Sequence, residues 1–243
     1  LKANFFPAFS ICLLLLSTAT IKYQLDLAFG LWLAGAVLHF ILTIIMVSRW
    51  LNQQYQITQI NPAWFIPVVG NLIVPLAGLK FVNKEICWFF FSVGIFFWII
   101  LFALVFYRLV FHEPGPKQVL PTLFIFIAPP AVAFMAYTKL AGQVDAFARI
   151  LLYMAWFFVI LLLAMIKSFL KLDFFVTWWA YTFPLCAVTI ASITAFALLK
   201  LPLFAWIAKA LLLMTTLVVV IVLFKTLCAF YKNRICVPEP GQP

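Results

Sequence analysis

Charged side chains are scarce in this sequence of 243 residues, where they make up 9% of the chain against 67% hydrophobic residues. A soluble domain of ordinary composition carries about 25% charged residues. Because so few charges cannot cover the surface of a domain in water, the shortage excludes a soluble protein. The composition predicts an all-α polytopic protein that is integral to a membrane.

Acidic residues and histidines are scarcer still, at six and two in the whole chain. The acidic residues lie near the ends of apolar stretches or in loops, so no paired carboxylates, metal cluster or serine triad can be drawn from them. The five cysteines are scattered, mostly inside apolar runs, which is not the spacing of a disulfide framework. We expect no enzymatic activity, no metal and no cofactor.

Basic residues give the chain a net charge of +10, but they lie at the ends of apolar stretches and form no patch. That distribution is typical of membrane boundaries, so we expect no nucleic-acid partner. Lysine and arginine number nine on the membrane face that would hold the C-terminus and seven on the other face. The excess predicts a cytoplasmic C-terminus.

Eight apolar stretches are long enough to cross the hydrocarbon core of a bilayer, which takes about 20 helical residues. Their connections are short, so residues 1–232 form a single transmembrane domain and residues 233–243 a short C-terminal tail. The sequence starts at Leu1 and becomes apolar almost at once, which predicts a fragment or a trimmed chain. The expected helices cover residues 4–21, 27–48, 62–79, 86–111, 120–138, 149–166, 174–198 and 203–226.

Prolines recur inside every second stretch, at Pro7, Pro67, Pro129 and Pro184, with spacings of 60, 62 and 55 residues. This period predicts a repeated helical hairpin in which kinked and straight helices alternate. A broken helix in lipid must face protein or water, so we expect the kinked helices to form an inner layer around a central pore and the straight helices an outer layer. The alternative is that the kinks serve packing only, since proline is common in membrane helices.

The interiors of the expected inner helices carry hydroxyls and amides, such as Ser10, Asn71 and Thr189, but no ionisable group. The deep histidine, His39, lies on an outer helix, where it either bonds a neighbouring helix or carries protons. Five lysines near the inner-helix ends favour anions at the pore mouth: Lys22, Lys80, Lys84, Lys139 and Lys200. A wall that binds anions weakly suits a channel better than a pump.

Two stretches carry a family resemblance: NPAWFIPVVGNLIVPLAG (61–78) and WWAYTFPLCAVTIASITAF (178–196). They resemble the tellurite-resistance TehA proteins and the plant slow-type anion channels, of the tellurite-resistance/dicarboxylate transporter superfamily. The resemblance implies ten helices in five hairpins around a pore, in a homotrimer, with the eight stretches here as the third to tenth helices. It also implies that Phe183, in the YTFP segment, closes the pore. Without the resemblance, Phe183 is one of 29 phenylalanines that can pack a core.

Together these features predict an anion channel in a bacterial inner membrane. It passes small monovalent inorganic anions, of the chloride or nitrate type, through a pore gated by Phe183. One alternative is a carrier of C4-dicarboxylates or of oxyanions such as tellurite. A more distant alternative is a structural or signalling membrane subunit without flux.

Overall fold

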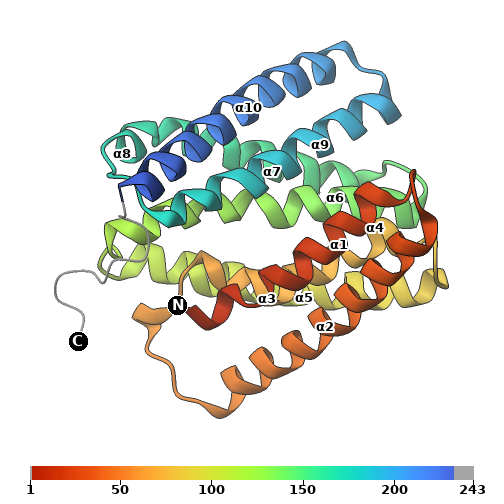
Figure 1. Cartoon of the computed structure of the whole chain (residues 1–243), viewed down its shortest axis with the longest axis horizontal. Coiled ribbons are helices and arrows are strands. Elements are labelled where there is room, and N and C mark those ends of the chain that lie inside the picture. Colours follow the sequence, from red (N-terminus) through yellow and green to blue (C-terminus); the bar gives the residue numbers. More distant parts are fainter. Residues whose placement is uncertain (1, 233–243) are drawn as a thin grey trace.

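The computed structural model describes residues 2–232, and every regular element within them is a helix (Figure 1). Six helical stretches in this range are long and apolar enough to cross a bilayer. This confirms the all-α polytopic membrane fold. The expected tail at 233–243, which contains Arg234 and Cys236, lies outside the described residues.

Four long, uninterrupted α-helices have no proline in their interiors and form the outer layer. They are α2 (Leu25–Asn52), α5 (Lys84–Phe111), α7 (Ala146–Ala164) and α10 (Pro202–Tyr231). Their starts are fixed locally, because the side chain of Asn83 accepts a hydrogen bond from the Glu85 amide at 2.9 Å and that of Asp145 accepts one from the Ala148 amide at 3.0 Å. Pro202 occupies the first position of α10, where its missing N–H costs nothing.

The helices between them change type along their length. Each begins with a 3-10 turn and continues as an α-helix: η1 (Lys2–Phe5) before α1 (Ala8–Thr20), η5 (Lys117–Ile127) before α6 (Ala128–Ala141), and η6 (Val176–Tyr181) before α9 (Thr182–Leu199). The third stretch alternates twice, through η3 (Pro62–Phe65), α3 (Ile66–Val69), η4 (Gly70–Leu72) and α4 (Val74–Gly78).

The four periodic prolines mark these changes of helix type. Pro7 caps α1, Pro67 and Pro129 are the second residues of α3 and α6, and Pro184 is the third residue of α9. In the first turn of an α-helix the amide has no intrahelical partner, so a proline there loses no hydrogen bond. The prolines therefore begin α-helical segments, which differs from the mid-helix position expected from hydropathy.

Two of the eight expected spans are short for a bilayer, although the structure matches the expected 62–79 to within one residue and shortens only 4–21. Ala8–Thr20 and Pro62–Gly78 are apolar helical stretches of 10–17 residues, and 13 α-helical residues reach only about 20 Å of a hydrocarbon core about 30 Å thick. A further short helix, α8 (Ile166–Leu170), follows α7 where the prediction had only the end of a span. Helix η2 (Ile57–Gln59) lies in the loop after α2.

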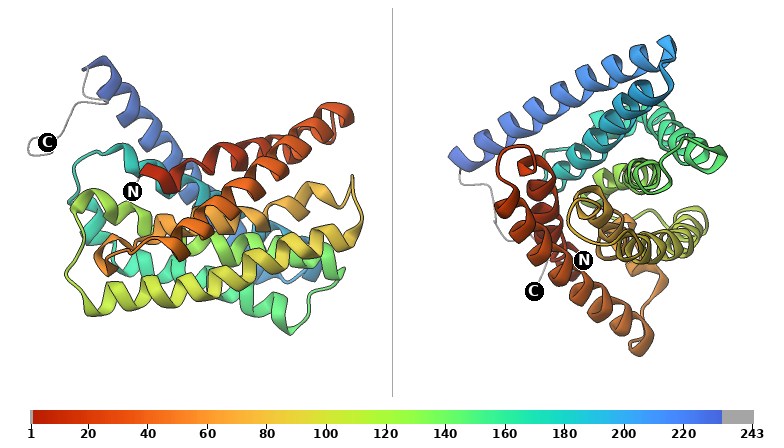
Figure 2. Two further views of the ribbon diagram at one scale, coloured as in Figure 1. Left: turned by 90° about the horizontal axis from the view of Figure 1, so that it is seen from below. Right: turned by 90° about the vertical axis from the view of Figure 1, so that its right-hand side faces the viewer.

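Burial separates the two layers. In the most apolar window of Lys117–Ala141, 78% of residues are buried, against 22% to 39% in the four outer helices. Contacts run along the inner layer from α1 to α4, from α4 to α6 and from α6 to α9. The inner helices thus form an arc, visible when the bundle is viewed from its right-hand side (Figure 2). The stretch Val176–Leu199 is 44% buried, because one face of α9 at the end of the arc is open.

Side-chain hydrogen bonds join the layers. Thr43 of α2 donates to the Pro67 carbonyl at 2.7 Å, and Trp32 of α2 donates to the Val74 carbonyl at 3.0 Å. On the other side of the arc, Thr189 of α9 bonds Thr215 of α10 at 2.8 Å. Side chains of the outer helices therefore hold the irregular inner segments by hydrogen bonds to the carbonyls and hydroxyls of those inner segments.

His39 is the most confined polar side chain of this interface. Its Nδ1 lies 2.8 Å from Ser10 Oγ on α1, and its ring is fully buried. Gly70, at the start of η4, leaves the space for the ring, because a Cβ built there would overlap the imidazole. The histidine thus bonds a neighbouring helix, as one of the two sequence interpretations proposed.

This contact predicts that Gly70→Ala lowers the free energy of unfolding by about 3 kcal/mol, because a methyl group must displace a ring that is packed on all sides. The measurement is thermal unfolding in detergent, followed by tryptophan fluorescence. Gly30→Ala is the matched control: a Cβ at Gly30 meets nothing within 4 Å, so its stability should stay the same or rise. Equal effects of the two substitutions would contradict the packing role of Gly70.

Candidate functional site

Phe183 lies in the first turn of α9, directly before Pro184. It is half-buried and belongs to a row of accessible side chains on one face of the helix. This row, the α9 stripe, consists of Phe183, Cys186, Ile190, Ile193 and Ala197. The spacing of three and four residues keeps all five on one face, and none of them is charged.

The opposite face of α9 is buried against other helices. Thr189 bonds Thr215 of α10 at 2.8 Å, and Ser192 accepts a hydrogen bond from the Trp156 indole of α7 at 2.8 Å. Ser10 and Asn71 are likewise buried and bonded to outer helices or nearby carbonyls. The sequence analysis placed these polar groups on the inner walls. In the structure they form hydrogen bonds between helices or to nearby carbonyls, and none of them belongs to the α9 stripe.

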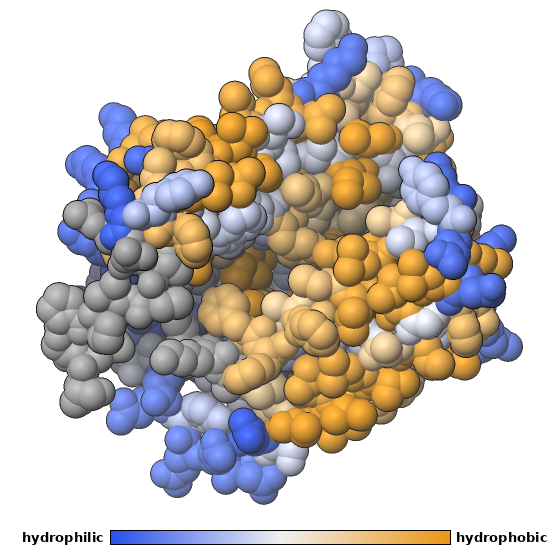
Figure 3. Space-filling model, viewed as in Figure 1, coloured by the Kyte–Doolittle hydropathy of each residue, from blue (hydrophilic) through white to orange (hydrophobic). Residues whose placement is uncertain are grey.

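A second apolar row lies on α1, at the other end of the arc. This α1 stripe consists of Phe6, Phe9, Cys12 and Leu16, and Phe9 is 65% exposed. Between the α1–α2 and α9–α10 hairpins the surface is hollowed, and the visible walls of the hollow are mainly apolar (Figure 3). The α1 stripe and the α9 stripe are therefore the accessible surfaces of the inner layer along which a path for ions can run.

The middle of the arc is filled. Along α6, the residues from Ala128 to Ala136 are all buried, with none of the apolar side chains more than 8% exposed. Small side chains, including Ala131, Ala133 and Ala136, let the neighbouring helices approach α6 closely. Within the described residues, α6 therefore offers no water-accessible surface over this length.

The five predicted lysines lie at one end of the bundle, where the inner helices end (Figure 1). Lys22, Lys80 and Lys84 are exposed in or beside the turns that lead to α2 and α5. Lys139 is engaged, since its ammonium donates to the Leu76 carbonyl of α4 at 2.8 Å. Lys200 caps α9 with its ammonium 6.0 Å from the centre of the Phe196 ring.

The structure does not bring Phe183 and the lysines together. Phe183 stands at the start of α9 and Lys200 at its end, a separation of about 25 Å at 1.5 Å per residue. The candidate gate and the basic mouth are therefore two separate features of the bundle.

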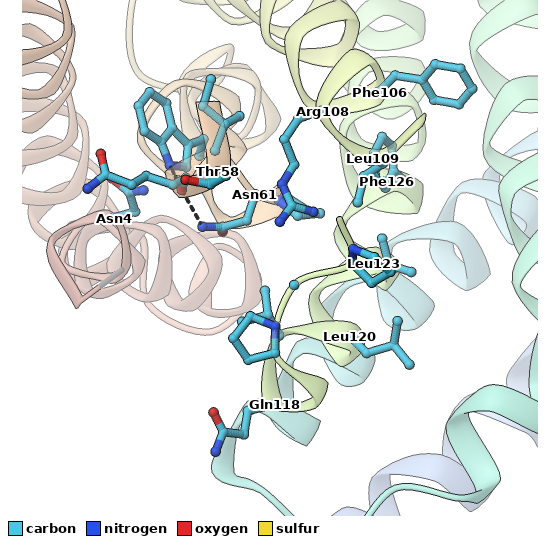
Figure 4. Close-up of a pocket in the computed structure, with 18 of the residues that line it drawn as sticks. Asn4, Thr58, Asn61, Phe106, Arg108, Leu109, Gln118, Leu120, Leu123 and Phe126 are labelled. Atoms are coloured by element: carbon cyan, nitrogen blue, oxygen red, sulfur yellow. Dashed lines mark hydrogen bonds between the residues drawn. The ribbon is translucent and has the colours of Figure 1, made fainter. Parts of the chain in front are cut away.

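A pocket of about 760 Å³ lies at the opposite end, where the inner helices begin (Figure 4). We call it the arginine pocket, because Arg49 in the last turn of α2 and Arg108 in the last turn of α5 both line it. Sequence reasoning counted both arginines only toward membrane orientation. No local signal marks the pocket, because its walls come from four separate stretches of the chain.

The architecture defines an integral membrane protein with an arc of irregular inner helices, an uncharged accessible face and basic groups at its ends. The chain belongs to the SLAC1 family: the family model, described as a voltage-dependent anion channel, matches residues 1–227. This confirms the resemblance to the TehA and slow-type anion channel proteins.

Individual relatives agree with this membership. The chain is 31% identical over 242 residues to the S-type anion channel SLAH3 of Arabidopsis thaliana, covering 98% of this chain and 38% of that protein. It is 38% identical over 133 residues to SLAH2 of the same plant, covering 55% of this chain and 26% of SLAH2. An uncharacterized transporter of Methanocaldococcus jannaschii, MJ0576, is 25% identical over 257 residues, covering 95% of this chain and 74% of that protein. The chain thus spans less than two fifths of the length of these two plant relatives.

The α9 stripe predicts how thiols react. Cys186 lies one helical turn beyond Phe183 on the same face, so the ring shields it. In Phe183→Ala protein, a negatively charged methanethiosulfonate reagent should label Cys186 several-fold faster than in the wild type, as measured by mass spectrometry of the labelled peptide. Cys87, which is fully buried, should stay unlabelled in both proteins, and Cys186→Ser identifies the labelled site. An unchanged labelling rate would place Cys186 outside the shielded path.

Proposed function

We propose that this protein is an anion channel that passes small monovalent anions, such as chloride or nitrate, down their gradient. The proposal rests on one observation above all: the α9 stripe is apolar and uncharged, and Phe183 belongs to it in the first turn of the helix. Membership of a family described as anion channels supports it. The exposed lysines Lys22, Lys80 and Lys84 at the far end favour the entry of anions over cations.

Phe183 is the gate in this proposal. An apolar ring in a narrow apolar path excludes water, so an ion must lose its hydration to pass it, and such a constriction closes by dewetting. The ring sits two residues beyond the end of η6 and next to Pro184. A change of its rotamer, or a shift of the junction between the 3-10 and α-helical segments, moves the ring without disturbing the buried face of α9.

We further propose that the protein assembles as a homotrimer, as the resemblance implies, in a bacterial inner membrane with a cytoplasmic C-terminus. The orientation rests on the nine-to-seven distribution of lysine and arginine. In that orientation the lysine end faces outward and the arginine pocket faces the cytoplasm. Labelling of a cysteine added next to Lys22 from one side of intact cells tests this placement.

Phe183→Ala should raise anion conductance, because removing the ring widens and wets the constriction. The measurement is current or anion flux in liposomes that contain the purified protein. Phe196→Ala is the matched control, since Phe196 is on the same helix but outside the repeat of the α9 stripe, and its flux should match the wild type. Unchanged conductance of a normally folded Phe183→Ala protein would refute the gate.

Neutralising Lys80 and Lys84 together, each to Gln, should lower anion flux more at 0.01 M salt than at higher salt. The reason is screening, since the Debye length falls from about 30 Å at 0.01 M to about 10 Å at 0.1 M. Lys139→Gln is a less suitable probe, because it also breaks the bond to the Leu76 carbonyl. Equal reductions at both salt concentrations would contradict a steering role for these lysines.

The rival functions differ in the form of the flux. A carrier of dicarboxylates or tellurite would show saturable uptake that depends on a proton gradient, whereas a channel gives ohmic currents. The relative MJ0576 is named an uncharacterized transporter, which supports testing the carrier alternative. A structural or signalling subunit would show no flux in the same liposomes, even with Phe183→Ala.

A further inference from the structure

The side chain of Arg108, in the last turn of α5, is buried. It is only 6% exposed, and its Nε has no hydrogen-bond partner among the described residues. Its side chain points from α5 into the space between Asn61 and Leu123 (Figure 4). Gly115, in the loop after α5, lies against it, since a Cβ built there would be 3.4 Å from Nη2.

The walls around Arg108 suit a negative group. Among the described residues, the lining contains a second arginine, Arg49, and no aspartate or glutamate. Amide and hydroxyl side chains also line the pocket, namely Asn4, Thr58, Gln59, Asn61 and Gln118. A planar guanidinium can donate two parallel hydrogen bonds to an oxyanion, which a lysine ammonium cannot do.

The rest of the pocket is apolar and reaches the outer layer. Phe106 of α5 and Leu161 of α7 both line it and are 49% and 38% exposed. Leu120, Leu123 and Phe126 of η5 also line the pocket. The pocket therefore joins a cationic end to a surface that faces hydrocarbon, and its volume of about 760 Å³ exceeds what one small ion fills.

The arginine pocket is separate from the proposed conduction path. Its lining comes from η1, α2, the loop and helices around η3, α5, η5 and α7, and includes no residue of α9 or α10. Phe183 and the α9 stripe therefore do not contribute to it. A ligand can occupy this pocket whether or not the pore is open.

We propose that the arginine pocket binds an oxyanion of the phosphate type, held by the fork of Arg108 and by Arg49. An isolated charge is costly to bury, and a bound anion with matching hydrogen bonds removes that cost. The phosphate belongs either to the headgroup of an anionic lipid, whose chains enter between α5 and α7, or to a free phosphate from the aqueous side. The binding does not depend on anion conduction.

The test compares two probes on the purified protein. One arm titrates inorganic phosphate against detergent-solubilised protein and follows the midpoint of thermal unfolding at fixed scan rate, with sodium chloride at equal ionic strength as the control. The other arm measures lipid retained by native mass spectrometry after reconstitution with phosphatidylglycerol or phosphatidylcholine. A higher midpoint of unfolding with phosphate than with sodium chloride identifies a free anion as the ligand. Selective retention of phosphatidylglycerol over phosphatidylcholine identifies a lipid headgroup as the ligand.

Arg108→Met should lower the affinity for the bound probe at least tenfold, because two charge-assisted hydrogen bonds are lost. Arg108→Lys should lower this affinity less, since lysine keeps the positive charge but not the planar guanidinium. The matched control is Arg149→Met at the other end of α7, outside the pocket, which should bind as the wild type does. Without ligand, the midpoint temperature of unfolding of Arg108→Met protein should be no lower than that of the wild type, because the substitution removes a buried charge whose Nε has no hydrogen-bond partner among the described residues.

The proposal is overturned if neither probe binds the wild type, or if binding is the same in Arg108→Met. If Arg108→Met does not fold, Leu123→Trp replaces it, because the larger ring fills the pocket beside an intact Arg108. Unchanged affinity in both Leu123→Trp and Arg108→Lys then overturns the proposal. Flux through Phe183→Ala protein is measured separately, so failure of the channel function and failure of this site are distinguishable.

Discussion

Backbone polar groups have no water to bond in hydrocarbon, and this constraint shapes the whole bundle. Helices that alternate between 3-10 and α geometry are tolerated only where other helices meet their carbonyls. Here α2 meets them with Thr43 on the Pro67 carbonyl and Trp32 on the Val74 carbonyl. The regular outer helices are therefore a condition for the irregular inner ones, and the hairpin that joins an inner to an outer helix is the natural unit of repetition.

The same constraint decides where the polar side chains go. The hydroxyls of Thr189 and Ser192 on α9 are used toward α10 and α7. The residues of the α9 stripe itself remain apolar, while Thr182 and Thr194 are partly accessible beside it. An apolar accessible face is what a dewetting gate requires. Packing between the layers and the apolar character of the candidate path thus have one cause.

The sequence allowed the layers to be predicted, because hydropathy and the proline period report directly on burial and on helix interruption. It did not reveal that the prolines begin α-helical segments after 3-10 turns, since a proline near a span centre has the same local pattern in both cases. The fit of the His39 ring over Gly70 depends on two segments far apart in the chain. Arg108 was missed for a similar reason: an arginine at the end of an apolar run normally lies in the interface, whereas here the loop at Gly115 and other distant segments lie against it.

The separation of gate and charge has an energetic consequence for the proposed channel. At about 25 Å, one lysine charge acts on an anion at Phe183 by about 0.2 kcal/mol in water and about 0.7 kcal/mol at an effective dielectric constant near 20. Dehydrating an ion at an apolar ring costs far more, since burial of an isolated charge costs several kcal/mol even after relaxation. In the proposed channel the lysines therefore raise the concentration of anions at the mouth but do not lower the barrier at Phe183, so opening requires a movement of the Phe183 ring, by its rotamer or by the junction between η6 and α9.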